Sequence, residues 1–158
     1  TSNRGACHLR AFTAVAEVFG KMYRTATEGK AKLTKKLQDR GAASYDASGL
    51  CSFVDSAVGP EDVASMLRAA TGVAYTAEDL LKAGERIHNL ERLWNLKAGF
   101  SAKDDTLPHR MLNEPLTGGP SAGMVSHLDE MLREYYRLRG WTPEGVPTRE
   151  KLAELGII

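Results

Sequence analysis

The chain has 158 residues, of which 42% are hydrophobic and 26% are charged. This length and balance suit one soluble globular domain that buries its own core without disulfides. No stretch approaches the ~20 consecutive apolar residues that a membrane-spanning helix needs. No basic segment followed by an apolar one opens the chain in the manner of a secretion signal. We therefore expect a cytoplasmic protein with no membrane partner.

The net charge is +1, but the basic residues gather near the start of the chain. Residues 1–40 contain nine Lys and Arg residues against three acidic ones, a local charge of +6. Such a segment can meet phosphates or an acidic partner, although most basic helix faces only contact water. No aromatic residue interrupts Lys30–Arg40, which argues against a nucleic-acid surface. We expect no nucleic-acid partner.

The first half of the chain predicts three helices. An apolar run over residues 11–19 and a helical pattern over residues 28–40 are each followed by a glycine, and Gly41 is expected to end the second helix. Pro60 begins the third helix, because proline fits the first turn and the two acids that follow it favour the positive end of the helix dipole.

The second half of the chain predicts a long helix and several shorter ones. Thr76 is expected to cap a helix over residues 77–98, with acids in its first turn. Its buried face is expected to carry Leu80, Ala83, Ile87, Leu90 and Trp94. Further helices are expected at residues 109–113, 124–139 and 148–155. No strand of useful length alternates apolar and polar residues, so we predict an all-α single domain of at least five helices.

The chain has two cysteines, Cys7 and Cys51, and neither lies in a C-x-x-C pair. In a reduced compartment two isolated cysteines are usually just buried thiols. An independent zinc or iron–sulfur site requires four ligands. The chain therefore cannot supply such a site from its cysteines alone.

The most informative segment is Asp46-Ala47-Ser48-Gly49-Leu50-Cys51. A carboxylate, a flexible glycine and a thiol five residues after the carboxylate can all face one small buried ligand. From residue types alone, Asp46 is equally explained as a residue that caps backbone N–H groups in a turn. Cys51 is equally explained as a buried thiol, so both interpretations stay open at this point.

This D-x-x-G-L-C segment resembles the second pterin-binding motif of the aldehyde ferredoxin oxidoreductases, the tungsten enzymes with a bis-pterin cofactor. The similarity continues through segments that occur in the family's order: residues 2–10, 78–92, 99–110, 128–136 and 140–148. Each segment alone is a weak signal, but their order and coverage make the resemblance specific. It implies that residues 1–158 are the C-terminal helical domain of a larger enzyme, whose pterin-binding and cluster-binding N-terminal parts lie outside this chain.

The resemblance also implies roles for the motif residues. Asp46 would accept hydrogen bonds from the N–H groups of a pterin, Gly49 would let the backbone approach the ring, and Leu50 would contact the cofactor through its main chain. Cys51 would be the metal ligand, the last of four thiolates on a [4Fe-4S] cluster. An apolar neighbourhood would exclude water from that cluster, and its members are Leu50, Phe53 and Val54.

By the same resemblance, His8 is the candidate catalytic residue. An imidazole titrates near pH ~6.5, which suits proton transfer to or from a substrate beside the tungsten. A lone histidine beside an apolar run is as often structural, so both interpretations of His8 stand. We expect the other three histidines to be structural or solvent-facing: His88, His109 and His127.

The resemblance implies that the complete enzyme oxidises an aldehyde to a carboxylic acid at a tungsten, or less often molybdenum, centre held by two pterins. Two electrons would pass through a [4Fe-4S] cluster to ferredoxin. The expected partners are the N-terminal domains of the same protein, ferredoxin and the aldehyde substrate. The chain by itself is expected to be inactive and to retain no cofactor. Two alternatives stay open: a non-catalytic helical module for assembly, and a family member that acts on another oxo substrate.

Overall fold

The computed structural model describes residues 11–20, 24–53 and 57–158, and no strand occurs in these ranges. The prediction of an all-α fold with at least five helices is confirmed. The elements are α1 (Ala14–Phe19), α2 (Lys30–Gly41), the π-helix η1 (Ala42–Asp46), α3 (Pro60–Thr71), α4 (Ala77–Lys97), the 3-10 helix η3 (Ala102–Asp104), α5 (His109–Asn113), α6 (Leu128–Arg139) and α7 (Arg149–Glu154). No described helix is both long and apolar enough to cross a membrane.

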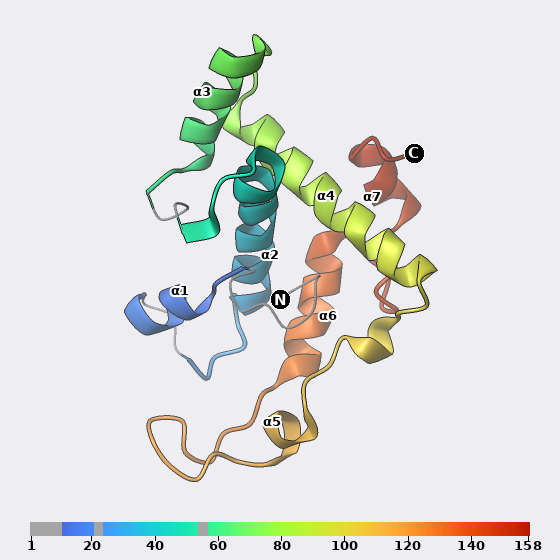
Figure 1. Cartoon of the computed structure of the whole chain (residues 1–158). Helices are drawn as coiled ribbons and strands as arrows, with labels where there is room; N and C mark the ends of the chain where they lie inside the picture. The colour runs from blue at the N-terminus through green and yellow to red at the C-terminus, as the bar shows by residue number, and fades with distance from the viewer. Residues whose placement is uncertain (1–10, 21–23, 54–56) are drawn as a thin grey trace.

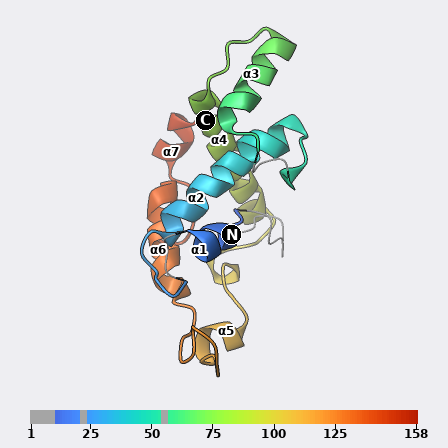
Figure 2. The ribbon, with the colours of Figure 1, turned by 90° about the vertical axis from the view of Figure 1, so that its left-hand side faces the viewer.

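Three helices form the centre of the molecule. The α2 helix contacts both α4 and α6, and α3 packs on α4 and η1. Figure 1 shows α2 and α6 running beside one another, with the long α4 helix crossing their ends. In both views α3 and α5 lie at opposite ends of the molecule (Figures 1 and 2). The α2 helix is therefore the element on which α4 and α6 meet.

The starts of α3 and α4 lie where the sequence predicts them. Pro60 is the first residue of α3, and the Gly59 N–H donates to the Asp62 carboxylate at 2.8 Å. At α4, the Asp79 N–H donates to Thr76 Oγ1 at 3.1 Å, and the Thr76 N–H donates to the Asp79 carboxylate at 3.0 Å. The Thr76 hydroxyl also donates to the Asp79 carboxylate at 2.7 Å, and this bond, together with the one from the Thr76 N–H, lowers the pKa of Asp79. Each cap satisfies backbone donors that the first turn of a helix leaves without partners.

One apolar cluster is small and lies where three elements meet. Its buried members are Ala43 of η1, Val63 and Ala64 of α3, and Leu80 of α4. Two of the four are alanines, so the backbones of these elements approach closely. Burial of so few large side chains contributes modestly at ~25 cal/mol per Å² of apolar surface. We therefore expect polar contacts to contribute much of the free energy that fixes the orientation of α2, α4 and α6.

The polar core centres on Arg139 of α6, which has no exposed surface. Its guanidinium pairs with the Asp39 carboxylate and donates to Gln38 Oε1 at 2.7 Å, and both acceptors belong to α2. The Tyr135 hydroxyl donates to the same Gln38 oxygen at 2.7 Å and lies 3.0 Å from His88 Nε2 on α4. Burial raises the pKa of Tyr135, so this hydroxyl stays protonated and can donate. One connected network thus joins α2, α4 and α6.

The predicted buried face of α4 is wrong in its second half. Leu90 is 47% exposed and Trp94 is 72% exposed. The side chains buried along that part of the helix are polar: His88, Asn89 and Arg92. They are buried because α6 and the chain after it give them partners. Asn89 Oδ1 accepts from the Trp141 indole N–H at 2.7 Å, and Arg92 donates to the Gly145 carbonyl at 2.8 Å.

The α2 helix ends at Gly41, as predicted, but the chain does not turn there. Gly41 is buried with helical φ and ψ of −62° and −46°, and the chain continues as the π-helix η1 through Asp46. The chain therefore stays helical through Ser48. A glycine ends a helix when it adopts a left-handed conformation, and packing holds Gly41 in the right-handed one. The predicted start of α6 near Met124 moves to Leu128.

Removal of one partner of the buried Arg139–Asp39 pair should be costly. We expect Arg139→Met to lower the free energy of unfolding by about 3–5 kcal/mol, because the Asp39 carboxylate would stay buried without its cation. Urea denaturation of the purified protein measures this loss. The matched control is Arg137→Met, in the same helix at an exposed position, where we expect less than about 0.5 kcal/mol. Equal losses for the two variants would contradict the expected contribution of the Arg139–Asp39 pair to stability.

The α4 cap gives a second, smaller prediction. Thr76→Ala should cost about 1 kcal/mol, because the first turn loses its side-chain acceptor. The contribution of Asp79 should be present above its ordinary pKa of 3.8 and decline as the pH falls below it, because folding lowers the pKa of this carboxyl. Unfolding curves between pH 7 and about pH 3 test both points. A pH dependence equal in Thr76→Ala and the wild-type protein would be evidence against the cap.

Candidate functional site

The D-x-x-G-L-C segment follows directly from the central helix. Asp46 is the last residue of η1, and one more helical turn leads to Gly49, whose N–H donates to the Tyr45 carbonyl at 3.0 Å. Gly49 has a φ of +73°, in the left-handed region that glycine adopts without strain. The Leu50 N–H then donates to Ser48 Oγ at 3.3 Å. The segment is thus a hydrogen-bonded turn that leads from the end of η1 to the surface.

Four of the predicted site residues lie together on this segment. Asp46, Gly49, Leu50 and Cys51 are all exposed, and Cys51 carries a free thiol. The fifth, His8, lies outside the described residues, as does Cys7, so the catalytic role of His8 stays a prediction. The described structure therefore places the carboxylate and the thiol on one surface segment of six residues.

The expected apolar shield around Cys51 does not form within the described part of the chain. Leu50 is 37% exposed and Phe53 is 76% exposed, while Val54 lies outside the described residues. Both side chains lie on the same exposed segment as the thiol, so they leave it open to solvent. Exposed apolar side chains beside a functional motif are typical of a surface that another part of a protein covers.

The donor groups of the D-x-x-G-L-C segment match only part of the set that the expected cofactors need. A [4Fe-4S] cluster takes about four thiolates, and Cys51 offers one exposed thiol. The Asp46 carboxylate is likewise exposed and can accept hydrogen bonds from a pterin edge. No group of three or more His, Cys, Asp or Glu residues in the described ranges is placed to hold a metal ion. At this segment the described chain offers one thiol and one carboxylate.

The sequence did not indicate a cavity of about 700 Å³ between α2, α4 and α6. Its polar lining includes His88, Arg92, Asp105 and Tyr135. Arg92 pairs with Asp105 at 2.8 Å and lies over the Trp141 ring, with 5.1 Å from Cζ to the ring centroid. His88, expected to be structural or solvent-facing, is 6% exposed and bonded to Tyr135. These polar groups satisfy one another, so they support the fold and leave little chemistry for a ligand.

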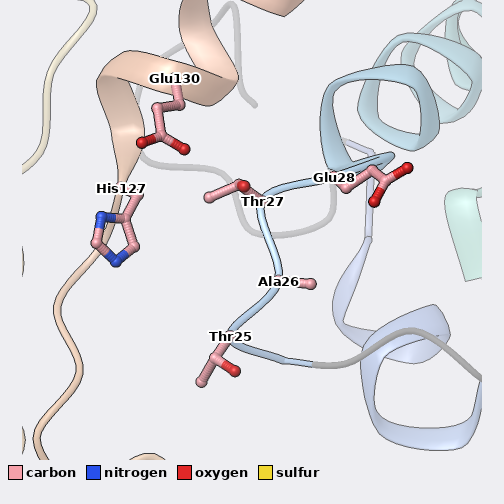
Figure 3. Close-up of a pocket in the computed structure, with 6 residues that line it drawn as sticks. All are labelled: Thr25, Ala26, Thr27, Glu28, His127 and Glu130. Carbon is pink, nitrogen blue, oxygen red and sulfur yellow. The ribbon is translucent and has the colours of Figure 1, made fainter.

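A second, shallow hollow lies beside the start of α2. Figure 3 shows Thr25 to Glu28 on one side of it and His127 and Glu130 on the other. The Glu28 side chain points away from His127. The hollow therefore lacks a convergent set of ligands, and we assign it no function.

Comparison with known proteins identifies the group to which the chain belongs. Residues 1–157 match the family model described as aldehyde ferredoxin oxidoreductase, domains 2 and 3. The chain belongs to the aldehyde ferredoxin oxidoreductase family. The tungsten-containing aldehyde ferredoxin oxidoreductases of Thermococcus kodakarensis and Pyrococcus furiosus are 48% and 46% identical to it, each over 99% of this chain. The family resemblance seen in the motif is confirmed.

The chain spans only 27% of the length of each of these two relatives. A solved structure, the active-site complex BamBC of benzoyl coenzyme A reductase with 1,5-dienoyl-CoA, superposes with a TM-score of 0.70. It covers 87% of this chain and 20% of that one, at 23% sequence identity. At this identity the likeness shows the shared helical fold alone.

The left-handed turn at Gly49 can be tested separately from any cofactor. Gly49→Ala should lower the free energy of unfolding by about 1 kcal/mol, because a side chain strains this conformation. Gly72→Ala is the matched variant: Gly72 has a φ of +74°, and an added β-carbon meets nothing within 4 Å at either position. Gly118→Ala, at a position that is open and lacks a positive φ, should cost little. Thermal unfolding of the three variants decides, and a neutral Gly49→Ala would show that the turn relaxes.

Proposed function

We propose that this chain is the C-terminal helical part of an enzyme that oxidises aldehydes to carboxylic acids and passes the electrons to ferredoxin. One observation supports this proposal above the others: a member of this family presents Asp46, Gly49 and Cys51 together on an exposed segment. The family's own relatives are named as tungsten-containing enzymes. Membership alone leaves open which part of the reaction these residues serve, and the motif indicates cofactor binding.

Each motif residue has a role that its chemistry suits. The Asp46 carboxylate accepts hydrogen bonds from a pterin's N–H groups, and its exposure leaves it accessible. Gly49 lets the main chain, including that of Leu50, lie close to the ring. Cys51, as a thiolate, binds one iron of the cluster. The bound tungsten–pterin centre and cluster supply the oxidation–reduction chemistry, and the protein supplies position and a dry environment.

His8 is proposed to hold or move a proton near the substrate carbonyl. An unperturbed imidazole titrates close to neutral pH, which suits a group that holds or moves a proton. The role follows from the R-G-A-C-H segment of residues 4–8. We keep it as a proposal that rests on the family alone.

The remaining ligands are proposed to come from the rest of the same protein. That part should contain a C-x-x-C-x-x-x-C run and a first D-x-x-G-L motif, and it should cover the exposed Leu50 and Phe53. Ferredoxin is the proposed electron acceptor, and the cytoplasm is the proposed location. If the sequence that accompanies these residues in the gene lacks both motifs, the proposal is wrong.

Substitution at the motif in the complete protein tests the assignment. Cys51→Ser should lose the cluster, up to about four iron atoms per protein, because an alcohol is a poor iron ligand. Asp46→Asn keeps the shape but replaces one acceptor oxygen with an NH2 donor, and should lower the apparent affinity for the tungsten–pterin centre about 10- to 100-fold. The matched control is Cys7→Ser, because the family assigns Cys7 no ligand role. Metal analysis and aldehyde-dependent ferredoxin reduction are the measurements.

The outcomes separate the two main hypotheses. Tungsten, iron and aldehyde oxidation in the wild-type protein, lost in Cys51→Ser but kept in Cys7→Ser, would support the enzyme. A purified complete protein without metal or activity would instead favour the non-catalytic helical module. Activity on a different oxo substrate, with both metals present, would keep the site assignment and change only the substrate.

A further inference from the structure

The segment that carries Asp46 and Cys51 follows a part of the chain where the backbones of two helices are in close contact. Gly84 is buried in the middle of α4. A β-carbon added there would lie 2.9 Å from the carbonyl carbon of Asp39 and 3.0 Å from the Ala43 nitrogen, and it would overlap the Asp39 carbonyl oxygen. Real β-carbons do not approach backbone atoms so closely. Only glycine allows α4 to pack on this part of the chain.

The contact falls where the helical pattern changes. Asp39 is near the end of α2, and Ala43 belongs to the π-helix η1 that follows it. A π-helix widens the backbone by one residue per turn, and such turns occur often at functional sites. Each residue of an α-helix turns about 100° around the axis. A change from π to α at this point would therefore rotate Asp46 by about 100° relative to α2.

Asp39 is held from a second direction by its side chain. Its carboxylate pairs with the buried Arg139 of α6 and accepts from Lys35 Nζ at 2.8 Å. The carbonyl of the same residue faces Gly84 of α4. Two neighbouring helices thus fix the last turn of α2, one through charge and one through shape. These two contacts together determine the direction of the chain after Asp39.

We propose that Gly84 is a positioning residue for the cofactor-binding segment. Its missing side chain lets α4 contact the backbone at Asp39 and Ala43, keeps η1 in the π form, and so sets the direction in which Asp46 to Cys51 leave the core. The cofactor-binding role of this segment rests on the proposed function. That Gly84 sets the direction of the segment is a statement about the fold of this chain, and it can be tested without any cofactor.

Gly84→Ala is the direct test, read by hydrogen exchange and by the cluster signal in the complete protein. The added methyl should push α4 from η1, so exchange of the amides of residues 42–51 should become at least about tenfold faster. The EPR spectrum of the reduced [4Fe-4S] cluster should change or weaken. Gly118→Ala adds the same methyl in open space and should leave both measurements unchanged.

A second control separates positioning from general loss of stability. Leu155 is 1% exposed and lies outside the apolar cluster that contains Ala43. Leu155→Ala should lower the unfolding temperature at least as much as Gly84→Ala. It should leave exchange at residues 42–51 and the cluster spectrum as in the wild type. If Gly84→Ala does not fold, Arg139→Lys, which loosens the hold on the Asp39 carboxylate, should speed exchange in the same segment.

Two results would overturn the proposal: unchanged exchange at residues 42–51 in Gly84→Ala, or equal effects of Gly84→Ala and Leu155→Ala on that segment. Failure of the proposed function looks different. A wild-type protein without a cluster would remove the cofactor interpretation, while faster exchange confined to residues 42–51 in Gly84→Ala would still establish Gly84 as the residue that positions them.

Discussion

The buried pair between Asp39 and Arg139 is the constraint on which the rest of the structure depends. It joins α2 to α6 in a place where few large apolar side chains meet. Burial by itself would lower the pKa of Arg139, yet Tyr135 and Asp39 together raise it, so the guanidinium stays charged. A buried cation without its carboxylate would be far costlier than the pair. The interaction therefore favours one arrangement of the two helices over its alternatives.

This arrangement explains how the D-x-x-G-L-C segment is presented on a small helical body. The α2 helix is held by α4 on one contact and α6 on another, and its continuation η1 ends at Asp46. The motif then leaves the core as an exposed segment, with Cys51 open to solvent. A site completed by another part of the protein needs its own share to be rigid in position and accessible in surface. The described chain provides the accessible surface.

Local sequence signals predicted the helix starts better than the packing. Pro60 and the Thr76–Asp79 cap act within one turn, so neighbours in the sequence were enough to predict α3 and α4. The end of α2 at Gly41 was predicted correctly, but the π-helix after it was not, because it depends on the helices that pack against this part of the chain. The buried face of α4 was predicted wrongly for a similar reason, because the spacing of apolar residues favoured Leu90 and Trp94. In the structure, hydrogen bonds to Trp141 and to the Gly145 carbonyl allow Asn89 and Arg92 to be buried instead.

The sequence by itself determined the all-α class, most helix starts, the family and the residues of the motif. These depend on short-range periodicity, on caps and on the order of specific residues along the chain. Only the tertiary structure decided that α2 continues as a π-helix, that α4 buries polar side chains, and that Gly84 lies against the Asp39 backbone. The contacts behind these features join residues about 45 to 53 positions apart, and no local pattern carries the balance of burial, charge and close contact that settles them.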